Sequence, residues 1–362
     1  MIMTFPALIT LAFAISLMCS ALIFFSKPFH IRFTAKGHGR SAVQSAHKNP
    51  TPRIGGLAIL AGFAITSCFF DAAMTQTALF LQVAMLPVFI GGIGEDTGFN
   101  VSPVLRLVFS FISALVAGLL LDQWVSRIGI PGLDLIVATT ITAAILTIVI
   151  AGGFSHAFNL IDGINGLAIG VAIMMATSLA VIGYLKGDHL VLSFAGVLAA
   201  SCLGLFLFNF PFGKLFLGDA GAYSIGHLLM WVAVMLINRH ADIAPFALLL
   251  IFFWPIADML LSIYRRYNAG KPISAPDRLH FHQLVMRGLE ITILGRHRRH
   301  LANPLATLII LPLASIPMIL GVLSYNSDKR AAVAFVLAIL IFVLTYRFGG
   351  WMAKRYASTA GK

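Results

Sequence analysis

Long apolar runs dominate this chain, and they leave few architectures open to it. A run of about 17–25 apolar residues is long enough to cross the hydrocarbon core of a bilayer as an α-helix. The sequence contains eleven such runs, at about 4–25, 54–70, 78–94, 104–121, 133–153, 167–185, 190–209, 221–238, 244–263, 304–323 and 331–348. The stretches between them are too short for a soluble domain of any size. The sequence therefore predicts an all-α polytopic membrane protein of about eleven transmembrane helices, with residues 1–362 forming one integral membrane domain.

The composition excludes the soluble and disordered classes. Hydrophobic residues make up 59% of the chain and charged residues only 10%, whereas a soluble domain carries about 25% charged residues. Disorder requires low hydrophobicity and high charge, the opposite of this composition. The three cysteines lie inside apolar runs without metal-ligand spacing, so the sequence predicts neither a disulfide framework nor a cysteine metal site.

The 25 lysines and arginines are distributed unevenly between the two sides of the membrane. Alternation of the eleven spans places twenty of them on one side, mainly in loops 26–53 and 264–303 and after 346, and five on the other. Because cytoplasmic loops carry the excess of positive charge, the N-terminus is expected outside and the C-terminus in the cytoplasm. The net charge of +12 is then mainly a topology signal, and no nucleic-acid partner is expected. The same charge can attract anionic lipid head groups or an anionic substrate.

The acidic residues divide into two groups by side. Six lie in outer loops or at outer helix ends, where solvated charges are expected: Asp71, Asp122, Asp134, Asp188, Asp242 and Asp328. Most of the others lie in three short, glycine-containing breaks on the cytoplasmic side: GGIGEDTGFN (91–100), HAFNLIDGINGLAIG (156–170) and FGKLFLGDAGAYSIG (212–226). An ionisable residue near a span is costly unless it faces a wet cleft, so these breaks are candidates for a functional site, as is Asp258 near the end of the ninth span.

Carboxylates and amide oxygens in such breaks are ligands that suit Mg²⁺, which also binds phosphate oxygens and water. Glycine beside a ligand lets the backbone approach a phosphate closely. Basic segments supply the complementary charge: NPTPRIGGLAI (49–59), preceded by Lys48, and SAPDRLHFHQLVMRG (274–288). The pattern predicts phosphoryl transfer at the membrane surface, where catalysis is mainly positioning and charge stabilisation. No strand precedes the glycine-rich segments, so a Rossmann-type nucleotide site is not predicted.

Taken together, these five segments resemble the polyprenyl-phosphate N-acetylhexosamine-1-phosphate transferases of glycosyltransferase family 4. The most specific pieces are NPTPRIGGLAI, FNLIDGINGLA, FLGDAG and PDRLHFHQL. The last resembles the branch that initiates O-antigen and enterobacterial antigen more than the peptidoglycan branch. The resemblance implies a multi-pass protein of the bacterial inner membrane. The implied reaction is attack of undecaprenyl phosphate on the β-phosphate of a UDP-N-acetylhexosamine, giving undecaprenyl-diphospho-sugar and UMP, with Mg²⁺ or Mn²⁺ as cofactor.

The resemblance also implies roles for individual residues. Asp219 would be the principal Mg²⁺ ligand, with Asp162 and Asn159 lining the nucleotide–metal site and Asn165 near the uracil. The diphosphate would be bound by Arg278, His280 and His282, while Lys48 and Thr51 would supply a basic side chain and a hydroxyl.

The pair Glu95–Asp96 stands where the family has two aspartates. Adjacent helical residues point about 100° apart, so the two cannot serve one role equally. The longer glutamate side chain suits the less demanding position. We therefore expect Asp96 to face the lipid phosphate and Glu95 to act electrostatically in support.

Other departures from the family pattern leave alternatives open. His156 replaces an expected asparagine, and Gln283 replaces the last histidine of the family's histidine motif. Asn165 stands where the peptidoglycan branch has aspartate, which argues against the phospho-N-acetylmuramoyl-pentapeptide transferase as the alternative function. A secondary transporter is the alternative of another class, although the polar groups collect at one face and not at the midplane. The sequence does not identify the sugar, the polysaccharide pathway or the oligomeric state, for which a homodimer is one option.

Overall fold

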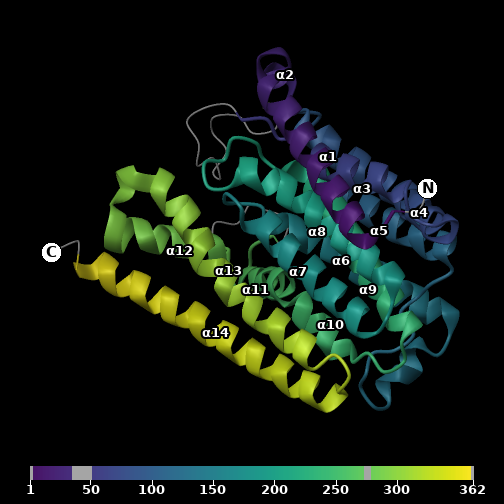
Figure 1. Cartoon of the computed structure of the whole chain (residues 1–362). Coiled ribbons are helices and arrows are strands. Elements are labelled where there is room, and N and C mark those ends of the chain that lie inside the picture. Colours follow the sequence, from purple (N-terminus) through teal and green to yellow (C-terminus); the bar gives the residue numbers. More distant parts are fainter. Residues whose placement is uncertain (1–2, 35–50, 273–278, 360–362) are drawn as a thin grey trace.

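The computed structural model describes residues 3–34, 51–272 and 279–359, and this part of the chain is helical with no β-strand. The long helices are α1 (Phe5–Phe25), α4 (Ala72–Asp96), α5 (Pro103–Leu121), α6 (Thr140–Leu160), α7 (Leu167–Leu185), α8 (His189–Asn209), α9 (Gly218–Arg239), α13 (Arg299–Leu323) and α14 (Asp328–Thr359). The shorter helices are α2 (Lys27–Thr34), α3 (Gly56–Ser67), α10 (Pro245–Ile251), α11 (Phe253–Asn268) and α12 (Phe281–Leu289). Figure 1 shows them as one bundle, with α14 along one side of it.

The eleven predicted spans fall on helices, but three of them differ from the simple transmembrane helices predicted. The predicted span 133–153 begins with a short 3-10 helix, Leu133–Val137, and its long helix α6 starts only at Thr140. Nine helices of the described residues are long and apolar enough to cross a membrane. The predicted span 244–263 is instead a pair, α10 and α11, bent by 79°. The predicted span 54–70 is only the 12-residue α3, which covers about 18 Å at 1.5 Å per residue, less than the roughly 30 Å of a hydrocarbon core. The protein is an all-α, multi-pass membrane protein.

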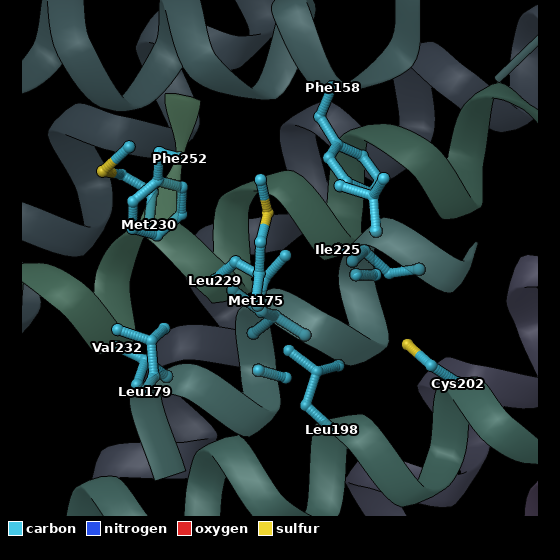
Figure 2. Packing of buried hydrophobic residues seen from close by; sticks show 14 of the residues in the cluster. Phe158, Met175, Leu179, Leu198, Cys202, Ile225, Leu229, Met230, Val232 and Phe252 are labelled. Carbon is cyan, nitrogen blue, oxygen red and sulfur yellow. The ribbon is translucent and has the colours of Figure 1, made fainter. Parts of the chain in front are cut away.

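Helix α9 is the centre of the bundle. Its membrane-crossing window is buried completely, whereas only 22% of the α1 window and 17% of the α14 window are buried. Helices α3, α4, α5, α6, α7 and α8 all contact α9. A helix that is apolar on all sides is expected at such a position. Apolar side chains of α6, α7, α8 and α9, among them Phe158, Met175, Leu198 and Leu229, belong to the one large core cluster (Figure 2).

Three of the six acids predicted to be solvated are in fact structural. Asp71 and Asp188 cap the N-termini of α4 and α8 by accepting hydrogen bonds from backbone N–H groups three residues on. Asp134 accepts bonds from the N–H groups of Ile128 and Gly129. The prediction of solvated charges is wrong for these residues, because short loops leave helix ends whose N–H groups need acceptors.

Candidate active site

The chain before α3 runs beside the chain before α9 and is held there by backbone hydrogen bonds. Gly55 N–H donates to the Phe216 carbonyl and Phe216 N–H donates to the Pro52 carbonyl, both at 2.9 Å. Gly218 ends this pairing with a φ of +77°, and a Cβ on it would overlap the carbonyl oxygen of Arg53. Only glycine meets both requirements without strain. This pairing places Arg53 at the N-terminus of α9.

Asp219, the second residue of α9, lies between two arginines. Its Oδ1 is 3.2 Å from Nη2 of Arg53, and its Oδ2 accepts a hydrogen bond from Nη1 of Arg106, in the first turn of α5. The three side chains are largely buried, with 9% of Asp219, 15% of Arg106 and 21% of Arg53 exposed. Charge-assisted hydrogen bonds of this kind are short and strong. Two arginines around one carboxylate also form a concentration of positive charge that can bind phosphate.

Asp96, the last residue of α4, caps α9 from a different helix. Its Oδ1 and Oδ2 accept hydrogen bonds from the N–H groups of Asp219 and Ala220, each at 2.9 Å, and Arg53 Nε lies 3.4 Å from Oδ1. A negative charge is favourable at a helix N-terminus, where N–H groups lack helical partners. The Asp96 side chain is fully buried.

The expectation that Asp96 faces the lipid phosphate and Glu95 supports it stays a prediction, and the structure gives the two carboxylates different surroundings. Both carboxylate oxygens of Asp96 accept hydrogen bonds from backbone N–H groups. Glu95 is half-buried, and its carboxylate has no hydrogen-bond or ion-pair partner within the described residues. The pair was interpreted from side-chain length alone, and the sequence did not show that α9 would begin beside α4.

Asp162 lies in the turn between α6 and α7, and its half-buried carboxylate is likewise unpaired within residues 3–34, 51–272 and 279–359. Burial raises the pKa of Asp162 to about 7, with a further increase from the Asp219 charge and an opposing effect from Arg53. The charge of Asp219 therefore acts on Asp162, although the two residues come from different breaks in the sequence.

The donor set fits a divalent cation. A group of three or more His, Cys, Asp or Glu side chains able to hold a metal is not found in the described part of the chain. Mg²⁺ does not require such a group, because one or two carboxylates with substrate phosphates and water usually complete its octahedron. Asp219 and Asp162, whose carboxylate has no partner among the described residues, would supply the carboxylates that this requires.

The α6 side of the site carries a polar group around Tyr223. The Tyr223 hydroxyl lies 3.1 Å from Nδ1 of His156 and within hydrogen-bonding reach of Asn159. Asn159 and His156, the residue that departs from the family pattern, therefore meet the same buried hydroxyl of α9. The charges of Arg106 and Asp219 act on Tyr223, which connects this group with the acidic centre.

Asn165 lies in the turn before α7, and its expected place near the uracil stays a prediction. It is buried, its side-chain Nδ2 donates to the Pro211 carbonyl at 2.9 Å, and its backbone N–H donates to Oδ1 of Asn303 at 2.8 Å. Thr307 donates to its carbonyl oxygen at 2.6 Å. These bonds fasten the turn that carries Asp162 to α13, so Asn165 supports the site from behind.

The two predicted histidines lie at the start of α12. His280 precedes the first helical residue, and its Nδ1 is 3.0 Å from Oδ2 of Asp258 on α11. The rings of His280 and His282 are nearly parallel, with centroids 5.8 Å apart. Nε2 of His282 has no partner among the described residues and lies against Gly163, where a Cβ would overlap it. This contact joins the histidine segment to the turn of Asp162.

Burial lowers the pKa of His282 to about 4, an effect that His280 strengthens and Asp258 opposes. His282 is therefore neutral near pH 7.

The structure thus brings Asp219, Asp162, Asn159 and the Glu95–Asp96 pair together, with His282 at the edge. Thr51 is half-buried shortly before α3, while Lys48 and Arg278 lie outside the described residues. Arg106 and Tyr223 were not predicted as site residues, whereas Asp258 was predicted only as a candidate without a role. Arg106 and Asp258 had a signal, because each is a charged residue beside or within an apolar run, whereas Tyr223 had none.

Carboxylates and arginines gathered at the end of a transmembrane bundle are suited to an enzyme that acts on phosphates at a membrane. Comparisons with known proteins give the class of protein more closely. The sequence model of glycosyl transferase family 4 matches residues 78–237, which include Glu95, Asp96, Asp162 and Asp219. The chain is 29% identical over 251 residues to the probable undecaprenyl-phosphate N-acetylglucosaminyl 1-phosphate transferase of Bacillus subtilis, covering 67% of this chain and 68% of the relative. It is 27% identical over 312 residues to the undecaprenyl-phosphate α-N-acetylglucosaminyl 1-phosphate transferase of Escherichia coli K12, covering 82% and 80%.

A third relative, the decaprenyl-phosphate N-acetylglucosaminephosphotransferase of Mycolicibacterium smegmatis, is 29% identical over 285 residues, or 71% of this chain and 70% of its own. By these matches the chain is similar to glycosyl transferase family 4 and to the polyprenyl-phosphate N-acetylglucosamine-1-phosphate transferases. The chain is accordingly a membrane transferase.

Proposed function

We propose that the protein transfers an N-acetylhexosamine 1-phosphate group from a UDP-sugar to undecaprenyl phosphate. An oxygen of the lipid phosphate forms a bond to the β-phosphorus of the nucleotide sugar, and the anhydride bond to the α-phosphate breaks. The products are undecaprenyl-diphospho-sugar and UMP. The observation that carries this proposal is Asp219, held between Arg53 and Arg106 at the N-terminus of the buried helix α9.

The names of the relatives support the same chemistry and favour N-acetylglucosamine as the sugar. We further propose that the product initiates a cell-surface polysaccharide such as O-antigen. The twenty-to-five distribution of lysine and arginine supports a cytoplasmic position for the site and an inner-membrane location for the protein.

Asp162 and Asp219 would hold Mg²⁺, or Mn²⁺ in its place. When bound, the ion would neutralise charge on the diphosphate. Arg53 and Arg106, which pair with Asp219 in this structure, would bind phosphate oxygens. Glu95, whose carboxylate has no partner among the described residues, would act electrostatically in support, and Asp96 keeps α9 in place. The lipid phosphate is already largely ionised near neutral pH, so positioning is the main requirement.

The test is a purified-protein assay of UMP release with undecaprenyl phosphate, Mg²⁺ and a panel of UDP-N-acetyl sugars. We expect release with UDP-N-acetylglucosamine or a related deoxy sugar, dependence on both lipid phosphate and divalent cation, and a lipid-linked product. A site built to hydrogen-bond one sugar hydroxyl discriminates strongly against analogues that lack it, so the panel identifies the sugar.

Two further arms distinguish the alternatives. Release with UDP-N-acetylmuramoyl-pentapeptide alone would assign the protein to the peptidoglycan reaction. Folded protein that releases no UMP with any donor would refute the transferase proposal.

A further inference from the structure

Asp258 is a buried carboxylate on α11 with both oxygens committed to the histidine segment. Only 2% of the residue is exposed. Its Oδ2 lies 3.0 Å from Nδ1 of His280, and its Oδ1 accepts a hydrogen bond from the Phe281 N–H at 2.9 Å. Asp258 therefore binds both the ring of His280 and the first backbone N–H of α12. It does not touch the acidic centre around Asp219.

The bend of 79° between α10 and α11 turns α11 out of the path of a straight span. Asp258, Ser262 and Arg266 follow each other at intervals of four and are all buried, so they share the inward face of α11. The acid is thus presented to α12 by the helix geometry.

Aromatic packing fixes the backbone between the two histidines. The Phe281 ring lies 4.9 Å from that of Trp254 on α11 and 5.4 Å from that of Phe342 on α14, measured between centroids. Trp254 and Phe342 also contact each other at 5.4 Å. Because Phe281 is held on both sides, His280 and His282 cannot reorient independently of α11 and α14.

The chemistry of this pair determines where His280 carries a proton. An ionised carboxylate accepts hydrogen bonds and has none to donate, so it selects the form of His280 with hydrogen on Nδ1. Any proton that His280 binds or gives up is then exchanged at Nε2, the nitrogen turned away from Asp258. Carboxylates that fix imidazole tautomers in this way are typical of functional histidines.

We infer that Asp258 is a positioning residue of the active site, which sets the tautomer and orientation of His280 and fastens the start of α12. The inference rests on the proposed function where activity is measured, and on the geometry alone where the tautomer is measured. Asp258 acts only through His280 and the Phe281 N–H and contacts no substrate.

The primary variant is Asp258→Asn, which has nearly the same shape. Its carbonyl oxygen can still accept from Phe281, but its NH₂ group then faces Nδ1 of His280 and moves the ring proton to Nε2. We expect kcat to fall by about 10–100-fold, as for other groups that orient a functional histidine, with KM for the nucleotide sugar changed much less. Ser262→Ala, one turn along the same buried face, is the matched control and should retain wild-type kcat.

A double-mutant cycle separates positioning from a general structural effect. In a His280→Ala background, Asp258→Asn should cause little further loss, because the residue it acts through is gone. If the two substitutions instead lowered kcat by independent factors that multiply in the double variant, the inference would be overturned.

¹⁵N-histidine NMR of the full-length protein gives a readout that requires no activity. The His280 signal, assigned by its loss in His280→Ala, should show hydrogen on Nδ1 in the wild type and in Asp258→Glu, and on Nε2 in Asp258→Asn. Hydrogen on Nε2 alone in the wild type would overturn the inference even if Asp258→Asn proved unstable. If no UMP is released but the tautomer is as expected, the proposed function fails and the positioning role stands.

Discussion

Asp219 receives one hydrogen bond on each carboxylate oxygen from a separate arginine, and its ionised form is the centre of the site. Asp219→Asn removes the charge that Arg53, Arg106 and a divalent cation share. We expect turnover to fall by at least about 10²–10³-fold, which is the usual loss when one strong electrostatic stabiliser is removed. The measurement is UMP release by the folded Asp219→Asn variant. Asp242→Asn is the control, because Asp242 is 58% exposed and pairs only with Lys186. Wild-type turnover in Asp219→Asn would refute the metal-binding role.

Glu95 and Asp96 should respond differently to loss of charge. Asp96→Asn puts an NH₂ group against N–H groups at the start of α9, so we expect it to lower thermal stability by about 1–2 kcal/mol, the usual value of a helix cap, together with activity. Glu95→Gln should leave stability unchanged and lower kcat, because its carboxylate has no partner in the described structure. Thermal unfolding in detergent and UMP release measure the two effects. Equal stability of the two variants would contradict the capping role of Asp96.

At the scale of elements, the turn between α6 and α7 touches α12 through Gly163 and His282. Gly163→Ala would push its methyl group into Nε2 of His282. We expect a lower kcat and a lower stability, because the buried His282 ring has to move, although the backbone at Gly163 does not itself require glycine. Gly153→Ala in α6 is the matched control, because its Cβ would meet no atom within 4 Å. If both variants kept full activity, the contact between the turn and α12 would have no functional role.

The loop before α8 is joined to the end of α9 by Asp188, which accepts hydrogen bonds from Arg239 Nε at 2.7 Å and from His240 Nε2 at 2.8 Å. Burial tends to raise the pKa of Asp188, but the hydrogen bonds from Arg239, the Val191 N–H and His240 outweigh it and hold the pKa below its usual value.

A carboxyl group whose folded-state pKa is depressed stabilises the protein above its unfolded pKa of about 3.9, and this contribution disappears as the pH falls through the folded value. Asp188→Asn should therefore lower stability by about 1–3 kcal/mol at pH 7. The difference from wild type should narrow as the pH falls below about 4. Thermal unfolding at pH 7 and at a series of pH values below 4 measures it. A difference independent of pH would show that the charge of Asp188 is not what stabilises this joint.

The elements themselves were largely predictable, because a long apolar run has few alternatives to a helix in a membrane. The exceptions have local causes that hydropathy does not reveal. Helix α3 ends at Ser67, and Asp71 starts a new helix four residues later. The predicted start of α9 at 221 missed its first turn, since Asp96 caps it from another helix.

The site was predictable only in part. Asp162 and Asp219 stood out because an acid next to a glycine is unusual beside apolar runs. Their distance from each other, the two arginines on Asp219 and the buried position of Asp96 depend on contacts between helices far apart in the sequence. Arg106 was counted only as a topology signal.

At the scale of the whole molecule, the orientation in the membrane remains a prediction that native and introduced cysteines can test. Cys68, exposed after α3, is expected outside, whereas the exposed Lys271 after α11 is expected in the cytoplasm. A membrane-impermeant maleimide should label Cys68 in intact cells with a permeable outer envelope. In a variant that combines Cys68→Ser with Lys271→Cys, the maleimide should label the introduced cysteine only after the membrane is opened. The reverse pattern would invert the topology and place the active site outside.

The enclosure of α9 has a consequence for how the protein is made. This helix is the least apolar of the nine candidate spans, and it carries Asp219 in its first turn and His227 in its interior. As the ribosome delivers the chain, α3 to α8 are synthesised before α9, and all of them contact it in the finished protein. A segment with an acid and a histidine gains most when such neighbours are already present, since they replace lipid around its polar groups. Biogenesis is therefore expected to retain the earlier helices beside the insertion machinery until α9 arrives, and α13 and α14 then close the bundle.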